Sequence, residues 1–412
     1  MTDPATFLRR LFDCAVATAD PMRFIAPNLP PKPSGRVLVI GAGKASARMA
    51  EAVEAEWGPC EGLVITRYGY ARPTRGIEIV EAAHPVPDAA GVAATRRMLA
   101  MLAGLGPDDL VLALISGGAS ALLCAPAGVM TLAEKQAVNA ALLASGAPID
   151  QMNLLRKHLS RVKGGQLAAV AAPASMLAMM ISDVPGDDPA MIGSGPTVGD
   201  ASTAADARAV AARWGIDLPA SARDVLDAPS LVVAPGDPRL ARVENRLVAA
   251  PAQSLAAAAR MAQAEGVPVL MLGDDLGGEA REVAAQHAAL AQRTPGPCLL
   301  LSGGELTVTR RGDGLGGPTA EDALALAIAL AGARGIHAIA CDTDGVDGGA
   351  EVAGALIGPD TLARAARAGI DPQAALTRND AHGFFGAIGD QVVTGPTLTN
   401  VNDFRAILIE AN

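Results

Sequence analysis

One lysine stands directly after a glycine-rich turn near the amino end of the sequence, in the stretch RVLVIGAGKAS. The apolar run before it predicts a strand that ends at Gly41 and Gly43, and Lys44 begins the helix predicted next. Glycines let a backbone approach a ligand closely, and the first N–H groups of a helix favour an anion. The spacing therefore predicts a phosphate-binding turn with an ammonium group in place. The alternative is a tight turn whose lysine is solvated.

This turn matches neither of the two common nucleotide-binding motifs. A dinucleotide fingerprint would have a third glycine where Ser46 stands, and no acidic residue closes a second strand at the usual distance, unless Arg67 contacts a phosphate instead. A Walker A motif would require other residues at Leu38 and Ala45. The turn therefore indicates an anion site of another kind.

Two apolar runs end in Ser-Gly-Gly, LISGGASALL at 114–123 and LLSGGELTVT at 300–309. Successive backbone N–H groups in such turns can form a concave site for a carboxylate or a phosphate. A structural turn is the alternative, and no histidine partner indicates a serine nucleophile. We predict that both turns hold anions, through Ser116, Gly117, Gly118 and Ser120 in the first and Ser302, Gly303 and Gly304 in the second.

A basic segment, NLLRKHLSRVKGGQLA at 153–168, contains no acidic residue in a chain of formal net charge −10. We predict one helix here, on which Lys157 and Arg161 share a face and Arg156 and Lys163 share a face. A solvated basic face is the common explanation for such a run. The neighbouring turns favour an anion clamp, in which Arg156 and Lys157 bind the substrate and Lys163 binds phosphate.

Acidic side chains gather in two loops that follow apolar runs, ISDVPGDDP and ACDTDGVDGG. Mg²⁺ prefers oxygen ligands, and a carboxylate beside a hydroxyl can instead accept its proton. The second loop lacks the terminal glutamate of an EF-hand. We predict Asp183 and Asp188 as catalytic or metal-binding residues, Glu305 and Asp344 as further metal ligands, and Asn400 as a substrate contact.

The elements that must position these residues repeat an apolar strand, a glycine-rich turn and an alanine-rich helix. Strands that are apolar throughout and alternate with helices predict an α/β fold of mostly parallel sheets covered on both faces. A chain of 412 residues is long for one core. Proline and glycine cluster at 227–245, so we predict two domains, a Rossmann-like one at 1–238 and a second α/β domain at 239–412.

Composition excludes several classes of partner. The formal net charge of −10 argues against nucleic acid and anionic lipid, although not against a small anion held by a local basic cluster. The uncharged run 111–133 could suggest a membrane span, but its internal glycines and proline indicate a strand, a turn and a helix. Five scattered cysteines and the absence of a signal peptide indicate a protein of the reducing cytoplasm, which could form a homodimer.

Eight motifs in order resemble the glycerate 2-kinase family with a carboxyl-terminal MOFRL domain, which is often labelled hydroxypyruvate reductase. The motifs are GAGKAS, HPVPD, ISGGASALL, RKHLSRVKGGQLA, ISDVPGDDPAMIGSGPT, LSGGELTVT, DTDGVDGGAEVAGA and TGPTLTNVND. The resemblance implies ATP-dependent phosphorylation of D-glycerate to 2-phosphoglycerate, with Mg²⁺ or another divalent cation. It also implies two unlike α/β domains with the active site in the cleft between them, and it places the active-site lysine of the family at Lys44.

The sequence departs from the family pattern G-x-G-G-R-N-x-E at two positions. Pro318 stands where the family has arginine, and Thr319 stands where it has asparagine. If that arginine stabilises the transferred phosphoryl group, its absence bears on rate or substrate, and Arg310 or Arg311 would have to replace it. Two alternatives therefore accompany the kinase hypothesis: an NAD(P)H-dependent hydroxypyruvate reductase and a non-catalytic protein that binds a nucleotide or an organic acid.

Overall fold

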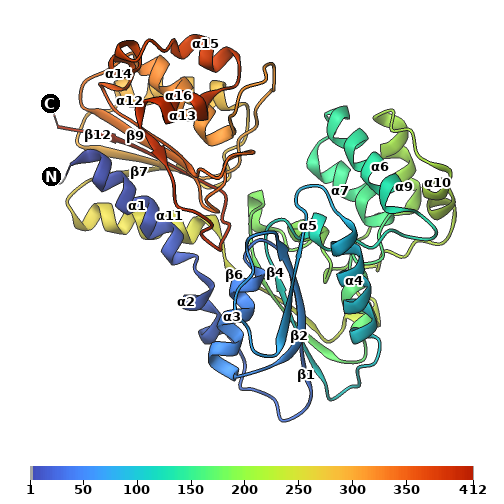
Figure 1. Ribbon diagram of the computed structural model, residues 1–412. Coiled ribbons are helices and arrows are strands. Elements are labelled where there is room, and N and C mark those ends of the chain that lie inside the picture. Colours follow the sequence, from blue (N-terminus) through green and yellow to red (C-terminus); the bar gives the residue numbers. More distant parts are fainter. Residues whose placement is uncertain (1–2, 412) are drawn as a thin grey trace. The chain divides into compact units, whose positions relative to one another are not determined.

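The computed structural model describes residues 3–411, which form two compact units (Figure 1). We call residues 21–182 and 187–248 the parallel unit, and residues 3–20, 183–186 and 249–411 the mixed unit. The predicted division at residue 238 differs from this one. Strand β6 (Val243–Ala249) belongs to the first sheet, so the break comes after it, and helix α1 (Pro4–Thr18) packs with the later residues.

The parallel unit is built on a six-stranded sheet with the order β3-β2-β1-β4-β5-β6. Strands β1 to β5 run parallel to their neighbours, as the uniformly apolar runs predict. This strand order is that of doubly wound nucleotide-binding sheets, in which ligands bind beyond the carboxyl ends of the strands. The strands are β1 (Val37–Ala42), β2 (Glu61–Arg67), β3 (Ile77–Ala82), β4 (Leu110–Ile115), β5 (Ser175–Ile181) and β6.

Helices cover both faces of this sheet, and a separate group of helices lies to one side of it (Figure 1). The separate group has its own apolar core, and capping boxes at Thr131 and Thr203 begin two of its helices. The covering helices are α2 (Pro21–Asn28), α3 (Ser46–Trp57), α4 (Ala89–Leu102), α5 (Ala119–Leu122) and α8 (Gln166–Ala171). The separate group contains α6 (Leu132–Ser145), α7 (Ile149–His158), α9 (Ala204–Arg213) and α10 (Ala220–Asp227).

The single helix predicted at 153–168 is wrong. Helix α7 ends at His158 and α8 begins at Gln166, and between them Ser160 forms an isolated bridge with Pro126. Gly164 and Gly165 have φ values of 57° and 78°, which only glycine adopts easily. The basic side chains therefore come from a helix end and a loop, and not from one helical face.

The mixed unit contains a second six-stranded sheet with the order β11-β10-β9-β12-β8-β7. Strand β12 lies between β8 and β9 and is antiparallel to both, an arrangement that the sequence analysis did not predict. The strands are β7 (Val269–Gly273), β8 (Cys298–Ser302), β9 (Ile336–Asp342), β10 (Gly354–Ile357), β11 (Gln391–Val392) and β12 (Asp403–Ile409). The short 3₁₀ turns of the chain are at Pro185–Asp187, Ile192–Ser194 and Pro238–Leu240.

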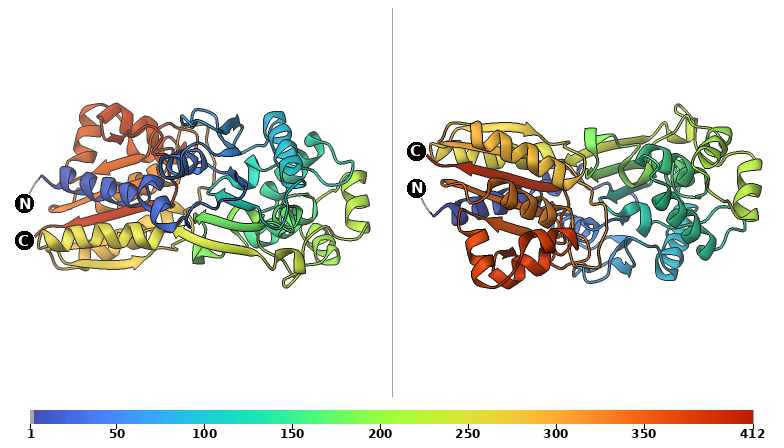
Figure 2. Two further views of the ribbon diagram at one scale, coloured as in Figure 1. Left: turned by 90° about the horizontal axis from the view of Figure 1, so that it is seen from below. Right: turned by 90° about the horizontal axis from the view of Figure 1, so that it is seen from above.

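Alternate residues of β12 pack into two different helical layers. Phe404 and Leu408 join the core under α1 and α11 (Pro251–Ala264), which lie side by side in Figure 2. Ile407 and Ile409 join the core under α12 (Ala280–Arg293) and α13 (Pro318–Leu330). The period of two residues in a strand therefore explains both layers. The remaining helices are α14 (Thr361–Arg367), α15 (Pro372–Thr377) and α16 (Ala381–Ile388).

The uncharged run 111–133 forms most of β4, the short helix α5 and the start of α6, which confirms the interpretation as a strand, a turn and a helix. Every helix among residues 3–411 is too short or too polar to span a bilayer.

Candidate active site

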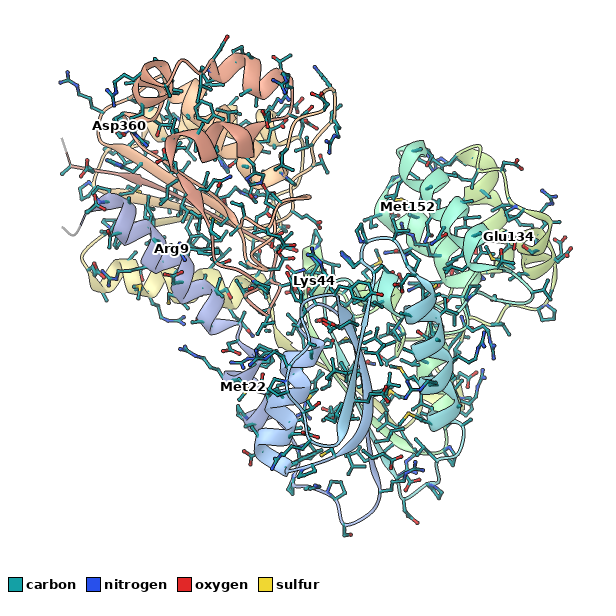
Figure 3. All side chains as sticks on the ribbon, in the orientation of Figure 1. Arg9, Met22, Lys44, Glu134, Met152 and Asp360 are labelled. Carbon is teal, nitrogen blue, oxygen red and sulfur yellow. The ribbon has the colours of Figure 1, made fainter. Side chains whose placement is uncertain are left out.

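Strands β1 and β4 end side by side, and the turns after them carry Lys44 and the first Ser-Gly-Gly. The two strands pair in parallel up to Ala42 and Ile115, so both turns lie at the same edge of the sheet. Figure 3 shows Lys44 at that end of the parallel unit, where its side chain is half-buried. Gly118 has φ 84°, and a Cβ there would lie 3.0 Å from the His84 ring and 3.4 Å from Lys44 Cγ. The absence of a side chain at Gly118 therefore lets His84 and Lys44 approach the Ser-Gly-Gly turn that follows β4.

The backbone N–H groups of the turn before α3 are all used inside the protein. Gly43 N donates to Ile65 O at 3.1 Å, Lys44 N to Gly117 O at 2.8 Å, Ala45 N to Ser116 Oγ at 3.0 Å, and Ser46 N to Gly43 O at 3.2 Å. A phosphate would therefore find no backbone donor here, which corrects the cradle predicted at this turn. What the turn offers a ligand is the side chain of Lys44.

Close packing explains the two glycines of this turn. A Cβ at Gly41 would lie 2.5 Å from the carbonyl oxygen of Leu114, and a Cβ at Gly43 would overlap the hydroxyl of Ser116. Both contacts are with the neighbouring strand β4 and its turn. The two glycines therefore let the turns after β1 and β4 pack closely, and this packing fixes the position of the Lys44 backbone.

We expect Gly43→Ala to destabilise the protein by about 2–4 kcal/mol, because the added Cβ combines a backbone strain at φ 141° with an overlap in a packed turn. Urea unfolding measures the loss. Gly58→Ala is the matched control, because Gly58 also has a positive φ, 76°, but has nothing within 4 Å of its missing Cβ. Equal losses for the two variants would contradict the packing explanation.

The two serines of the first Ser-Gly-Gly segment have different surroundings. Ser116 is fully buried, and its hydroxyl accepts from Ala45 N and lies 3.2 Å from the Ser46 hydroxyl. It therefore holds the turn together, in contrast to the predicted phosphate contact. Ser120 lines a cavity, where its hydroxyl lies 2.5 Å from that of Ser194.

A cavity of about 190 Å³ lies within the parallel unit, and basic side chains dominate its wall. Lys135 and Lys163 are 4% and 2% exposed, and Arg156 is half-buried. None of the lining residues is acidic. We call this cavity the basic pocket; it is lined by His84, Pro85, Gly118, Ser120, Ala121, Lys135, Asn139, Leu143, Arg156 and Lys163.

The basic groups of this pocket weaken one another's charge. Burial and the neighbouring charges of Lys135, Arg156 and Lys157 together lower the pKa of Lys163 to about 7, against an opposing effect of Cys124. Burial also lowers the pKa of Lys135 to about 8 and lowers the pKa of Arg156. Such a concentration of desolvated positive charge favours the binding of an anion.

Lys157 does not line the basic pocket, although it was predicted to bind substrate together with Arg156. Its ammonium lies 2.5 Å from the carboxylate of Asp200, and both side chains are largely buried. This ion pair neutralises Lys157, which corrects the prediction. The ring nitrogens of His158 lie 3.1 Å from the Ser202 hydroxyl and 2.9 Å from the Ser230 hydroxyl, as suits a structural histidine.

The structure brings Asp183 and Asn400 together in the mixed unit, where the amide of Asn400 donates to Asp183 Oδ2 at 3.4 Å. Asn400 is 5% exposed and Asp183 is half-buried. Asp188 lies in the parallel unit, is exposed, and accepts from Ala190 N at 2.9 Å within its own turn. Asp183 is therefore better held for chemistry than Asp188.

The second Ser-Gly-Gly turn is packed against its own unit. Gly303 N donates to Gly273 O at 2.9 Å, and its carbonyl accepts from the buried guanidinium of Arg405. A Cβ at Gly304 would overlap the backbone of Leu276. Ser302 is the last residue of β8, and its hydroxyl lies 3.4 Å from Arg405 Nε. These contacts give the turn a packing role, and the anion role of Ser302, Gly303 and Gly304 stays a prediction.

The carboxylates predicted as metal ligands do not form a cluster. Asp344 is buried, and one of its oxygens accepts from Val346 N at 2.8 Å, whereas Glu305 is exposed. Neither unit holds a group of three or more His, Cys, Asp or Glu side chains that could bind a metal within residues 3–411. A metal held by protein ligands alone is therefore not supported.

Asp347 occupies the amino end of α13, where the family arginine position falls at Pro318. Its two carboxylate oxygens accept from Thr319 N at 3.1 Å and from Ala320 N at 2.9 Å. Pro318 is the first residue of the helix, a position that suits proline. Arg310 donates to Gly314 O at 3.0 Å within the preceding loop. A protein carboxylate, and not a ligand, therefore satisfies this helix end.

Lys135 and Asn139 line the basic pocket from α6 and were not predicted as site residues. Their segment, TLAEKQAVNAALLAS, reads as an ordinary amphipathic helix with one lysine. The ammonium of Lys135 donates to Leu159 O at 3.1 Å, beyond the end of α7. Only this tertiary packing buries it, so no local signal could have found it. Lys163, Arg156 and Ser120 were predicted as anion-binding residues, and the structure places all three at the same pocket.

Comparisons with known proteins agree over nearly the whole chain. A family described as a domain of unknown function (DUF4147) matches residues 7–227, and the MOFRL family matches residues 298–403. The chain is 36% identical to the D-glycerate 2-kinase of Thermotoga maritima, with 94% of each chain covered. It is 56% identical to an Agrobacterium vitis protein named "Putative hydroxypyruvate reductase", over 98% of this chain and 94% of that one.

A solved structure gives the same picture. The crystal structure of glycerate kinase from Thermotoga maritima superposes with a TM-score of 0.87 at 34% identity, covering 98% of this chain and 99% of that one. Sequence and fold therefore agree on one group of relatives.

Proposed function

The chain belongs to the glycerate 2-kinase family with a MOFRL domain, and we propose that it catalyses the ATP-dependent phosphorylation of D-glycerate to 2-phosphoglycerate. The observation that carries the proposal is the basic pocket beside Lys44. Gly118 lines the pocket and also lies against the Lys44 stem, so an acid bound there has an ammonium group close by. A sugar acid and a phosphoryl donor are both anions, and such a site is suited to them.

In the proposed reaction, the C2 hydroxyl oxygen of D-glycerate attacks the γ-phosphorus of ATP. A new O–P bond forms, the bond from the γ-phosphorus to the bridging oxygen breaks, and ADP leaves with that oxygen. Catalysis of this transfer depends mainly on positioning and on neutralising charge. Lys44 neutralises charge on the transferred group. Asp183, which the Asn400 amide orients, accepts the hydroxyl proton.

A divalent cation fits these residues only as a partial site. Mg²⁺ in kinases commonly takes one or two carboxylates together with phosphate oxygens and waters, so it requires no cage of protein ligands. Asp344 or Glu305 would hold it where Asp183 accepts the proton, and Asp183 would hold it where another group does. When bound, the cation neutralises negative charge on the phosphates of ATP.

The reductase alternative has weaker support. A nicotinamide dinucleotide would place its pyrophosphate on the turn at Gly41 and Gly43, because that turn follows β1. The four N–H groups there, from Gly43 to Ser46, are already donated inside the protein. The name of the Agrobacterium vitis relative is therefore the main reason to test this activity.

A cytoplasmic location completes the proposal, because ATP is available there and the cysteines are free thiols.

An assay of ADP release with D-glycerate and ATP tests the proposal. Addition of enolase identifies the product, because enolase converts 2-phosphoglycerate, and not 3-phosphoglycerate, into phosphoenolpyruvate. This enol phosphate absorbs in the ultraviolet. We expect ADP release that depends on D-glycerate, followed by the enol signal. NADH oxidation with hydroxypyruvate, in the absence of ADP release, would favour the reductase. Acid binding without either reaction would favour a non-catalytic protein.

A further inference from the structure

The basic pocket contains more positive charge than the protein itself neutralises. Lys135, Arg156 and Lys163 line it, and no aspartate or glutamate does. Nearby Lys157 already has its own partner, Asp200. Holding like charges together in a desolvated wall costs stability, and an anion in the cavity would remove that cost.

The ammonium groups of this pocket are fixed by neutral acceptors. Lys163 Nζ donates to Ser120 O at 2.7 Å and to Ser120 Oγ at 3.3 Å. Lys135 Nζ donates to Leu159 O at 3.1 Å and to Arg156 O at 3.4 Å. A lysine has three N–H bonds, so each ammonium retains one for a ligand. These carbonyl and hydroxyl oxygens therefore orient the ammonium groups without neutralising their charge.

Eight side-chain polar atoms among residues 3–411 are buried without a hydrogen-bond partner, and two of them belong to residues that line the basic pocket. These two are the donor Arg156 Nε and the acceptor Asn139 Oδ1. Buried polar atoms in proteins almost always have a partner, which can be an ordered water, so a bound ligand that accepts from the first atom and donates to the second would suit this wall. A short hydroxy acid has both, because its carboxylate accepts and its hydroxyl donates.

Lysine is rare in this chain, which makes its position informative. Of 33 basic residues only five are lysine: Lys32, Lys44, Lys135, Lys157 and Lys163. Two of these line the basic pocket, and Lys44 lies against its Gly118. The surface of the protein thus relies on arginine for its positive charge. A compact ammonium suits a pocket that must close around one small oxyanion.

We propose that the basic pocket binds the unreactive end of the hydroxy-acid substrate: Lys135, Arg156 and Lys163 donate to its carboxylate, and Asn139 Oδ1 accepts from its 3-hydroxyl. The identity of the acid as D-glycerate rests on the proposed function. A cavity of about 190 Å³ is smaller than the roughly 300–1,000 Å³ of sites for drug-sized ligands, so it suits a three-carbon acid and not a whole nucleotide. A fully ionised phosphate has no donor for Asn139, which favours the acid over the γ-phosphate.

Isothermal titration of the full-length protein with D-glycerate, without nucleotide, tests this assignment. We expect Lys163→Met, Lys135→Met and Arg156→Gln each to weaken binding about 10–100-fold, as the loss of one charge-assisted hydrogen bond implies. Lys32→Met is the matched control, because Lys32 is exposed and donates only to Trp57 O. Asn139→Leu should reduce the preference for D-glycerate over D-lactate, which lacks the 3-hydroxyl.

The outcomes separate the two possible sources of the anion. Unchanged D-glycerate affinity in both lysine variants would overturn the proposal. Weaker binding of ATP or inorganic phosphate, with D-glycerate unaffected, would assign the pocket to a phosphate and overturn it as well. Binding of D-glycerate that depends on these residues, without ADP release, would support the pocket assignment while the proposed function failed.

Thermal unfolding gives a readout that a structural role would not produce. In the folded protein the pKa of Lys163 is lowered to about 7 from 10.5, by burial and by Lys135, Arg156 and Lys157, against an opposing effect of Cys124. The unfolded chain therefore binds more protons between those values, and stability rises with pH across that window. Removing the charge should thus stabilise the ligand-free protein most below pH 7. We expect the melting temperature of Lys163→Met to exceed that of the parent at pH 6 and the difference to shrink by pH 10. A variant that is less stable at every pH would mark Lys163 as a structural residue and overturn its role in binding.

Discussion

Replacement of Lys44 by methionine is expected to lower kcat for D-glycerate phosphorylation by about 10³-fold, with little change in the melting temperature. Methionine keeps the length and the apolar stem but removes the ammonium that neutralises the transferred group. The backbone of residue 44 keeps its hydrogen bond to Gly117 O, so the turn should still form. Steady-state kinetics of ADP release measure the effect.

Two controls make this result interpretable. Lys32→Met removes an exposed ammonium elsewhere in the parallel unit and should leave kcat unchanged. Binding of D-glycerate to Lys44→Met should remain within a few-fold of the parent, because the acid is held by residues of the basic pocket, and Lys44 does not line that pocket. Near-normal turnover in Lys44→Met would remove this residue from the mechanism.

Replacement of Asp347 by alanine is expected to destabilise the protein by about 2–5 kcal/mol. The variant would leave the N–H groups of Thr319 and Ala320 buried without acceptors, and His382 Nε2, 2.9 Å from Asp347 Oδ2, would lose its neighbour. Asp347 also repels the buried carboxyls of Asp322 and Asp403, so relief of that repulsion reduces the loss without cancelling it. Urea unfolding measures the change.

Asp371 offers the matched comparison, because its carboxylate also accepts from two N–H groups at a helix start, those of Gln373 and Ala374 in α15. Asp371 is exposed, so water can replace it, and its alanine variant should lose only about 1 kcal/mol. Similar losses of unfolding free energy at the two positions would show that burial of the α13 cap does not increase its contribution to stability.

The elements were predictable where the sequence carries a local signal. The uniformly apolar runs at Val37–Ala42 and Leu110–Ile115 predicted parallel strands, and the glycines after them predicted tight turns. The prediction of one helix at 153–168 was wrong because it relied on the spacing of the basic residues. It disregarded the Gly164-Gly165 pair, which commonly marks a break between helices. The central position of β12 was not predictable, because strand pairing depends on contacts distant in sequence.

The candidate site was predictable only in part, for the same physical reason. Arg156 and Lys163 stood out as basic residues in an acidic chain, but the sequence could not show that Lys157 faces Asp200. It also could not show that the Ser116 hydroxyl already accepts a hydrogen bond from Ala45 N in the turn before α3. The glycines at Gly41 and Gly303 looked alike as ligand-binding signals, yet both serve close packing within their own units.

The position of β12 has a consequence for how the nascent chain folds on the ribosome. The sheet of the parallel unit is complete once Ala249 has been synthesised, so that unit can fold while the rest is still being translated. The mixed unit cannot, because β8 and β9 are joined only through β12, whose last residue is Ile409. Helix α1 precedes the parallel unit in the chain, yet the elements that cover its apolar face, α11, β9 and β12, all follow that unit. The apolar face of α1 therefore has no partner until the whole parallel unit has been translated, and a stop before α11 would leave this face exposed to chaperones and proteases.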